Sequence, residues 1–247
     1  MLANQLTRPI LHPVPPASAC YSTSAHSGSC SDVIANFRNS QWRSDQPGAM
    51  EYTNFESFTP YNGTTSACYL DTTLGIPCRQ GSVPPVGVEV HSASDVQAAV
   101  HFARQHNLKL VVKGTGHDFL GRSTARGSFL IWTRHLNEMV YNPTFVPEGA
   151  PVTTENTFNG DFLFVFSHLP GTYVQYVSVV TLGAGVQWRE AFKFIEQYGR
   201  FVVGGSPTVG AAGGWVMGGG HGPMSPSYGL GTLLSFSFIW LAVELMI

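Results

Sequence analysis

Two glycine-rich segments are the parts of this sequence whose residue types and spacing best suit chemistry. The first is KGTGHDFLGRS at residues 113–123, and the second runs from Gly204 to Gly231. Glycine at this density is costly in conformational entropy, and it usually means that the backbone adopts positive φ or approaches a ligand closely. Such loops present consecutive N–H groups that can bind an anionic pyrophosphate. The alternative interpretation is that both segments are only tight turns.

His117 is the side chain in these segments that is best placed for chemistry, because it lies in the first loop between Gly116 and Asp118. A lone histidine is usually structural, but one in a phosphate-binding loop can contact a cofactor. The chain has nine histidines, and none shows H-E-x-x-H or another close spacing typical of metal ligands. The sequence therefore predicts no metal site.

Common nucleotide-binding and hydrolase motifs are absent from the sequence. There is no G-x-x-x-x-G-K-[ST] phosphate loop, and no G-x-G-x-x-G between a strand and a helix. A G-x-S-x-G nucleophile elbow is absent as well. These observations argue against P-loop, Rossmann-type and serine-hydrolase chemistry.

The elements before the first loop must position it. The pattern VGVEV at Val86–Val90 predicts a short strand. We predict that Ser94 then opens a helix through a capping box with Gln97, and that this helix stops at Asn107. The run Leu108–Lys113 predicts a buried strand that leads directly into the loop.

The segment after the first loop continues the alternation of strands and helices. Strands are predicted over Phe129–Thr133 and Val179–Leu182, and residues 142–178 receive no prediction. A second helix follows with Gly199 as its expected cap. The apolar residues along one face of that helix are Trp188, Phe192 and Ile195. This alternation predicts a mixed α/β or α+β fold.

Composition limits the classes of function. The chain of 247 residues can form one large domain or two small ones. Its net charge of −2 and its low share of charged residues, 11%, argue against a nucleic-acid partner. A hydrophobic content of 43% argues against intrinsic disorder.

The cysteines and the two ends of the sequence bear on the compartment. Three pairings of the cysteines are possible, and the short-loop pairing Cys20–Cys30 with Cys68–Cys78 is the one we predict. An even cysteine count and the sequon at Asn62 favour secretion, whereas four free thiols and a chance sequon are the alternative. No apolar signal-peptide core is visible at the amino terminus.

The carboxyl end, Leu233–Ile247, is almost wholly apolar. It is shorter than the about 20 residues that span a bilayer, so no membrane span is expected. A membrane anchor is the weaker interpretation of this tail, because Glu244 lies near its end.

Three ordered motifs, KLVVKGTGHDFLGRS, VTLGAGVQW and GGSPTVGAAGGWVMGGGHGPMSPSYGLG, resemble the FAD-binding PCMH-type domain of berberine-bridge-enzyme-like flavoproteins. This is the vanillyl-alcohol-oxidase superfamily, and the resemblance is to its fungal secreted branch. It covers residues 83–232 and implies an α+β fold of two α/β subdomains. Residues 1–82 would form a disulfide-bearing irregular segment, and residues 233–247 do not match the family.

The resemblance implies FAD as the cofactor, bonded covalently through its 8α carbon to His117. The remaining cofactor-binding residues that it implies are Gly114, Thr115, Gly116, Asp118, Gly121 and Ser123 in the first loop, and Pro207, Thr208, Gly210, Gly213, Gly214, Gly218, Gly219, Gly220, His221 and Gly222 in the second segment. Members with two covalent links carry a cysteine where this chain has Ser206. A serine hydroxyl cannot readily form that thioether, so we expect at most one link.

The activity implied by the resemblance is an FAD-dependent oxidoreductase that transfers hydride from a small alcohol, amine or sugar-like substrate to the flavin and then to oxygen. After Tyr228-Gly229-Leu230 the family continues into a substrate domain, whereas this chain runs into the apolar tail. We therefore expect the substrate domain to be missing, through truncation or mis-splicing, and no general base can be named. The alternative function is an inactive flavin-binding fragment.

Overall fold

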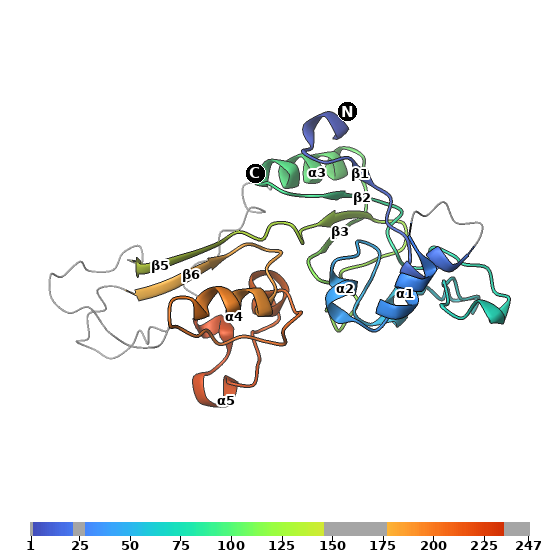
Figure 1. Ribbon diagram of the computed structural model, residues 1–247. Coiled ribbons are helices and arrows are strands. Elements are labelled where there is room, and N and C mark those ends of the chain that lie inside the picture. The colour runs from blue at the N-terminus through green and yellow to red at the C-terminus, as the bar shows by residue number, and fades with distance from the viewer. Residues whose placement is uncertain (1, 22–27, 146–176, 235–247) are drawn as a thin grey trace, which may run out of the picture. The chain divides into compact units, whose positions relative to one another are not determined.

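The computed structural model describes residues 2–21, 28–145 and 177–234. These residues form two compact units, one up to Leu136 and one from Asn137 onward (Figure 1). Both contain strands and helices, so the fold is α+β, as predicted. The boundary between the units lies inside the FAD-binding segment predicted over residues 83–232.

The first unit is built on a four-stranded sheet in the order β1-β2-β4-β3. Its strands and helices are β1 (Ile10–Leu11), α1 (Cys30–Asn36), α2 (Ser40–Ser44), β2 (Val86–Glu89), α3 (Ala93–Gln105), β3 (Leu110–Lys113) and β4 (Phe129–Trp132). Strand β1 is antiparallel to β2, whereas β2 and β3 both run parallel to β4. Trp132 is in register with both Glu89 and Lys113. The carboxyl ends of the three parallel strands therefore share one edge of the sheet.

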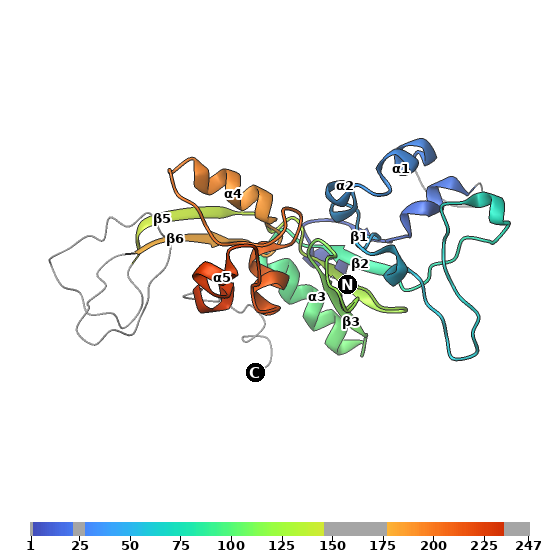
Figure 2. The same ribbon diagram turned by 90° about the horizontal axis from the view of Figure 1, so that it is seen from below.

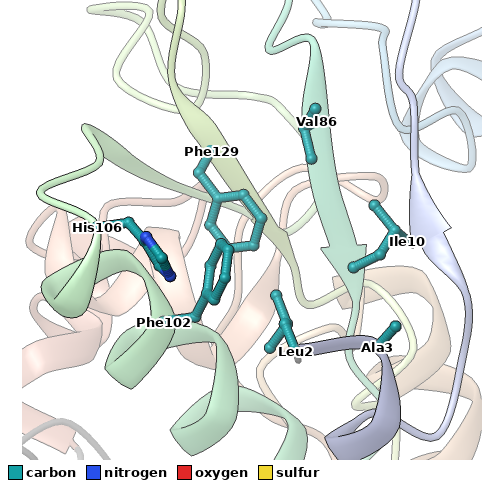
Figure 3. A pocket seen from close by; sticks show the side chains of 7 residues that line it. All are labelled: Leu2, Ala3, Ile10, Val86, Phe102, His106 and Phe129. Atoms are coloured by element: carbon teal, nitrogen blue, oxygen red, sulfur yellow. The ribbon is translucent and has the colours of Figure 1, made fainter.

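The core of this unit follows the alternation of side chains along its strands. Val88 and Ile131 face α3 and pack against Ala99 and Ala103, while Leu130 lies in a separate cluster. Figure 1 shows α3 running beside the sheet. An apolar pocket in the same layer is lined by Leu2, Ala3, Ile10, Val86, Phe102, His106 and Phe129 (Figure 3).

Helix α3 begins two residues before its predicted start. The predicted capping box at Ser94 is wrong, because the N-cap is Ser92, whose Oγ accepts a hydrogen bond of 3.2 Å from the backbone N–H of Asp95. Ser92 has extended backbone geometry, which an N-cap requires, whereas Ser94 already lies in the helix. The predicted stop is confirmed, since Asn107 adopts φ of 49° just past the end of the helix.

The run of apolar residues predicts a strand that is buried on both faces. Strand β3 is instead buried on one face only. Val111 and Lys113 are buried, but Leu110 and Val112 are 37% and 53% exposed. Leu110 and Val112 alternate with the buried pair, so they lie on the opposite face of the strand, and that face is partly exposed. An apolar run alone cannot distinguish this situation from burial on both faces.

The segment before residue 83 is held by disulfides and packs into the first unit. Disulfides join Cys20 to Cys30 and Cys68 to Cys78, which confirms the predicted short-loop pairing. Strand β1 pairs with β2, so this segment supplies an edge strand of the sheet. Its helices α1 and α2 span only a few residues each.

Asp95 joins the amino-terminal segment to the start of α3. Its carboxylate accepts hydrogen bonds from the backbone N–H of His91 at 3.0 Å and from the N–H and hydroxyl of Thr7 at 2.8 and 2.7 Å. Burial alone would raise the pKa of Asp95, but these hydrogen bonds outweigh it and lower the pKa from 3.8 to about 2. The folded state therefore favours the ionised carboxylate.

This depressed pKa predicts a specific contribution to acid unfolding. The stabilisation is complete well above pH 3.8, the ordinary pKa of an aspartate, and is lost as the pH falls through about 2. We expect Asp95→Asn to lower the free energy of unfolding at neutral pH by about 2 kcal/mol and to flatten its decline in acid. Urea unfolding followed by circular dichroism at several pH values measures both effects. Asp32→Asn, an exposed position on α1, is the control, and an equal loss there would contradict this assignment.

The second unit combines an antiparallel strand pair with a helix. Its elements are β5 (Met139–Phe145), β6 (Val177–Leu182), α4 (Trp188–Glu196), a π-helical turn (Ala211–Trp215) and α5 (Ser225–Tyr228). Strands β5 and β6 pair with each other, and α4 runs alongside them (Figure 2). Strand β5 begins before residue 142 and extends into the stretch 142–178, for which the sequence pattern made no prediction.

Helix α4 is capped by a reciprocal pair of side chains, Gln187 and Glu190. Trp188 and Ile195 are buried as predicted, whereas Phe192 is 36% exposed. Gly199 follows the helix with φ of 63°. Among the described residues, no helix is long and apolar enough to cross a membrane. Residues 146–176 of the predicted FAD-binding segment and residues 235–247 of the apolar tail lie outside the described ranges.

Candidate functional site

The first glycine-rich loop leaves the carboxyl end of β3 and turns twice through positive φ. Gly116 has φ of 84° and Gly121 has φ of 70°. A Cβ atom added to Gly121 would lie 2.5 Å from the ring of Phe55, so both its backbone angle and its surroundings require glycine. Glycine at these positions therefore shapes the loop that carries His117.

Lys113 ties the base of this loop to the segment before the sheet. Its ammonium donates hydrogen bonds to the backbone carbonyls of Gln46, Pro47 and Ala49 at 2.6, 3.0 and 2.6 Å. The backbone N–H of Glu51, two residues after Ala49, donates a further hydrogen bond of 3.0 Å to the carbonyl of Gly116 in the loop. Residues 46–51 thus lie directly against the loop.

Glu51 and His117 form the polar centre of this arrangement. The distance from His117 Nε2 to Glu51 Oε2 is 3.6 Å, and the His117 side chain is 14% exposed. Glu51 Oε2 is buried without a hydrogen-bond partner, while Oε1 accepts a bond of 2.5 Å from the Ser40 hydroxyl. Burial lowers the pKa of His117, and the carboxylate of Glu51 raises it by a smaller amount. The imidazole is therefore neutral at neutral pH and keeps a nitrogen lone pair.

Asp118 has a role within the loop. Its carboxylate accepts two hydrogen bonds from the Arg122 guanidinium, at 2.7 and 3.0 Å, and one from the Arg122 backbone N–H. These hydrogen bonds lower the pKa of Asp118. Beyond it, Phe119 and Leu120 are 67% and 73% exposed. The ion pair thus closes the loop while leaving two large apolar side chains on its surface.

Two tryptophans organise the second glycine-rich segment. The rings of Trp188 and Trp215 meet edge to face with their centroids 4.7 Å apart. A Cβ atom on Gly204 would lie 2.4 Å from the Trp188 ring, and one on Gly205 would lie 2.6 Å from Trp215. The indole N–H of Trp215 donates a hydrogen bond of 2.6 Å to the carbonyl of His221. These glycines are needed because aromatic rings lie flat against the backbone.

Four of the predicted cofactor-binding glycines of this segment form two contrasting structural groups. Gly220 and Gly222 serve close backbone packing, because an added Cβ would lie 2.7 Å from Gly231 and 2.2 Å from the Gly204 carbonyl oxygen, respectively. Gly214 and Gly219 have no atom within 4 Å of an added Cβ. The second group leaves open space beside the backbone, which a ligand could occupy.

This division predicts opposite outcomes for two alanine substitutions. Gly222→Ala should destabilise the chain by at least about 3 kcal/mol, because one backbone segment would have to move away from another. Gly214→Ala should change stability by less than about 0.5 kcal/mol but should weaken FAD binding. Urea unfolding and flavin fluorescence titration measure the two effects. Equal stability of both variants would contradict the packing role of Gly222.

The other predicted residues are divided between the two units. Gly114, Thr115 and Ser123 lie in the first loop, where Thr115 is buried. In the second unit, the carbonyl of Pro207 accepts a hydrogen bond of 2.8 Å from the N–H of Arg189 at the start of α4. Ser206 and the His221 side chain are exposed. The remaining predicted positions, Thr208, Gly210, Gly213 and Gly218, lie in the same segment around the π-helical turn.

Glu51 is the functional candidate that the sequence pattern missed. It lies far from His117 in the sequence and in no recognisable motif, so only the fold brings the two side chains together. The first loop fits a flavin-bearing site, because it holds a neutral imidazole beside a buried carboxylate oxygen that lacks a hydrogen-bond partner. The open surfaces of Gly214 and Gly219 fit close approach by a planar ligand.

Known proteins resemble this chain in both sequence and structure. A family model described as an FAD binding domain matches residues 84–144 and 144–235. An uncharacterized FAD-linked oxidoreductase of Arthroderma benhamiae is 38% identical over 219 residues, which cover 88% of this chain and 33% of that protein. An FAD-linked oxidoreductase of Aspergillus flavipes is 34% identical over 228 residues, covering 87% and 33% of the respective chains.

Two solved structures of flavoproteins are also similar to this chain. A VAO-type flavoprotein from Myceliophthora thermophila superposes with a TM-score of 0.71 at 30% identity, covering 92% of this chain and 36% of that one. A second VAO-type flavoprotein from the same organism superposes with a TM-score of 0.66 at 27% identity, covering 90% and 35%. The chain spans about a third of the length of the curated relatives it matches.

Proposed function

This chain belongs to the FAD-binding domain family, and on that premise we propose that it holds FAD through a single covalent bond to His117 as the flavin-binding part of an oxidoreductase. The observation that carries this proposal is the largely enclosed imidazole of His117, 14% exposed, which lies in the loop after β3 and faces Glu51 Oε2 at 3.6 Å. When bound, FAD supplies a hydride acceptor, and histidyl attachment withdraws electron density from the ring and favours hydride acceptance.

The residues around His117 have distinct roles in this proposal. Glu51 Oε2 faces His117 Nε2 at 3.6 Å, which is too long for a hydrogen bond, so the carboxylate favours a proton on that nitrogen through its charge and would bond it after a small approach. The Gly116 and Gly121 turns present the loop backbone to the pyrophosphate. Asp118 and Arg122 hold the loop closed by their ion pair.

Ser206 limits attachment to one bond. Its hydroxyl is a much weaker nucleophile than a thiolate, so a second link through this position is not expected. In the wider protein, we propose a small alcohol, amine or sugar-like substrate and oxygen as the electron acceptor. We also propose an oxidising, extracellular compartment, which the two disulfides support.

A second candidate function is flavin binding without turnover. It is favoured by the share of the relatives that this chain covers, about a third of their length. The two functions differ in one observable property: whether an added alcohol, amine or sugar reduces the bound flavin. Bleaching of the flavin absorbance under anaerobic conditions supports the oxidoreductase, and persistent oxidised flavin across these substrate classes supports the second candidate.

Flavin fluorescence on a denaturing gel tests covalent attachment. The full chain is incubated with FAD, denatured, separated and soaked in acid, so that only covalently bound flavin remains with the protein. We expect a fluorescent band, and we expect peptide mass mapping to place the flavin on His117 and not on Ser206. A dark band from protein that still binds FAD reversibly rejects the covalent bond. A chain that binds no FAD at all rejects the proposed function.

A further inference from the structure

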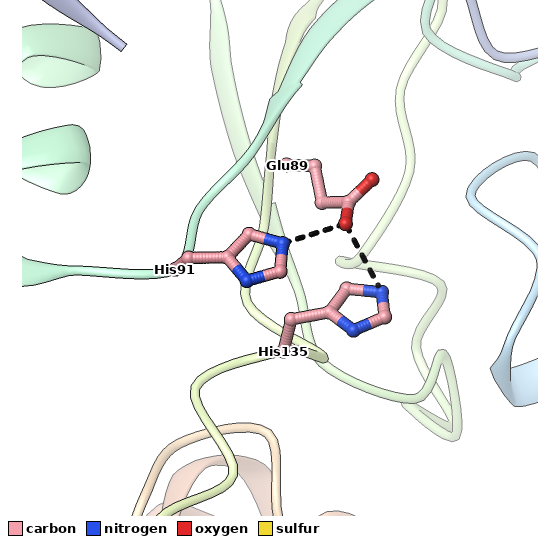
Figure 4. A group of neighbouring side chains, drawn as sticks. All are labelled: Glu89, His91 and His135. Carbon is pink, nitrogen blue, oxygen red and sulfur yellow. Dashed lines mark hydrogen bonds and ion pairs between the residues drawn. The ribbon is translucent and has the colours of Figure 1, made fainter. Parts of the chain in front are cut away.

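We propose that Glu89, His91 and His135 form a binding site for a divalent transition-metal ion with the preferences of Zn²⁺ (Figure 4). The three side chains lie at the edge of the sheet where parallel strands end. One atom from each lies within 4.8 Å of the others, counting a carboxylate oxygen and one nitrogen of each imidazole. This site lies wholly within the first unit and does not depend on the flavin.

The topology of the sheet explains why these residues meet. Glu89 is the last residue of β2, and His91 follows two positions later, so both side chains point to the same side. Trp132 pairs with Glu89 in the parallel register of β2 and β4, and His135 lies three residues beyond it. The carboxyl ends of adjacent parallel strands are a common place for ligands in α/β sheets.

The distances match the donor spacing of a small metal site. His91 Nε2 lies 2.7 Å and His135 Nε2 lies 3.5 Å from the same Glu89 oxygen, Oε1. Zinc bonds of about 2.0–2.2 Å in a tetrahedral site place neighbouring donor atoms about 3.4 Å apart. The donors, which lie within 4.8 Å of one another, must therefore draw together and reorient to surround one ion.

The two imidazoles are already held near each other. Their rings are stacked with centroids 5.0 Å apart and planes inclined by 6°. A shared ion requires both lone pairs to converge, so each ring must rotate about its Cβ–Cγ bond. The edge of Trp132 supports the His135 ring at 4.9 Å, and Asp95 fixes the backbone N–H of His91 at 3.0 Å. Backbone and aromatic contacts thus fix the positions of the two imidazole rings before an ion binds.

The electrostatic surroundings favour a cation. A metal ion binds an imidazole through the lone pair of its unprotonated nitrogen, and His91 and His135 each offer one nitrogen to the cluster. Arg134, the residue before His135, is paired with Asp45 at 2.8 Å, which offsets its positive charge. Glu89 supplies a negative charge that an ion would neutralise. Two imidazoles and one carboxylate suit Zn²⁺, and they leave a coordination position for water.

Access from solvent is available. The side chains of His91, Glu89 and His135 are 30%, 22% and 37% exposed, respectively. An ion could therefore enter without unfolding of the sheet. Without an ion, the group is a histidine–glutamate ion-pair cluster, and this is the outcome against which the site must be tested.

Calorimetric titration with ZnCl₂ tests the proposal on the full chain after removal of metals with EDTA. We expect one Zn²⁺ per chain near neutral pH, with weaker binding in acid because protons compete for the imidazoles. His91→Ala and His135→Ala should each weaken binding at least about 100-fold, because loss of even an outer-shell partner commonly costs 10–100-fold. His101→Ala, an exposed histidine on α3, is the matched control and should bind as the unchanged chain does.

A second measurement needs no substitution. Diethyl pyrocarbonate modifies accessible imidazoles, and peptide mass mapping locates each modified histidine. Zn²⁺ should protect His91 and His135 but not His101. Absence of one-to-one binding, unchanged affinity in His135→Ala, or protection of other histidines in place of these two would each overturn the proposal and leave the cluster as an ion pair only.

Discussion

His117→Ala is expected to abolish acid-stable flavin fluorescence while leaving a chain that still binds FAD reversibly. The alanine removes the only nitrogen that the proposed attachment uses, so the loss should be complete. The Gly116 and Gly121 turns are set by the backbone, and the Asp118–Arg122 ion pair does not involve the imidazole. The loop should therefore keep its shape. Denaturing gels and reversible FAD titration measure the two properties.

His101→Ala is the control for this experiment, because His101 is an exposed histidine on α3 away from the loop. Its fluorescent band should match that of the unchanged chain. Retention of a fluorescent band in His117→Ala would place the flavin on another residue. Loss of both attachment and reversible binding would show that the imidazole is needed to form the loop, and would contradict the separation of roles described above.

Lys113→Met is expected to destabilise the first unit by about 3–5 kcal/mol, because it removes the hydrogen bonds that a buried ammonium donates to three backbone carbonyls. Lys113 is 2% exposed, and its Nζ donates to the carbonyls of Gln46, Pro47 and Ala49. Methionine has a similar length but no N–H group. The midpoint of urea unfolding, followed by tryptophan fluorescence, measures the change.

Lys109→Met provides the matched control, since Lys109 is exposed just before the same strand. It should shift the unfolding midpoint very little. Burial lowers the pKa of Lys113 to about 7, although the nearby Glu56 carboxylate raises it by a smaller amount. Three carbonyl acceptors nonetheless require all three N–H bonds of the ammonium form. Equal midpoints for the two methionine variants would show that the three hydrogen bonds of Lys113 contribute little to the stability of the first unit.

The local pattern of the sequence predicted the strand–helix–strand unit around the first loop, because hydrophobic periodicity and Asn107 at the helix end are local signals. The cap of α3 was misplaced by two residues, since Ser92 and Ser94 are equally good caps by type and only backbone geometry separates them. The cysteine pairing was predicted correctly because both short loops close over ten residues.

The contacts that complete the site could not be predicted in this way. Glu51 and Lys113 act across more than sixty residues of sequence, and no periodicity encodes such pairs. Gly220 and Gly222 look like ligand-binding glycines, yet their lack of a side chain serves packing against Gly231 and Gly204. Glycine composition alone cannot distinguish an approaching ligand from an approaching backbone.

The binding of Lys113 by three backbone carbonyls also has a consequence for synthesis of the chain. Its three carbonyl acceptors precede the lysine by 67, 66 and 64 residues. At about 5–20 residues per second, a ribosome adds the lysine several seconds after these acceptors. Both disulfide loops can close during that interval, since their cysteines are separated by 10 residues each. All four cysteines are thus available for pairing before Lys113 can bind its three carbonyls, and the loop that carries His117 can reach its final shape only once the lysine has done so.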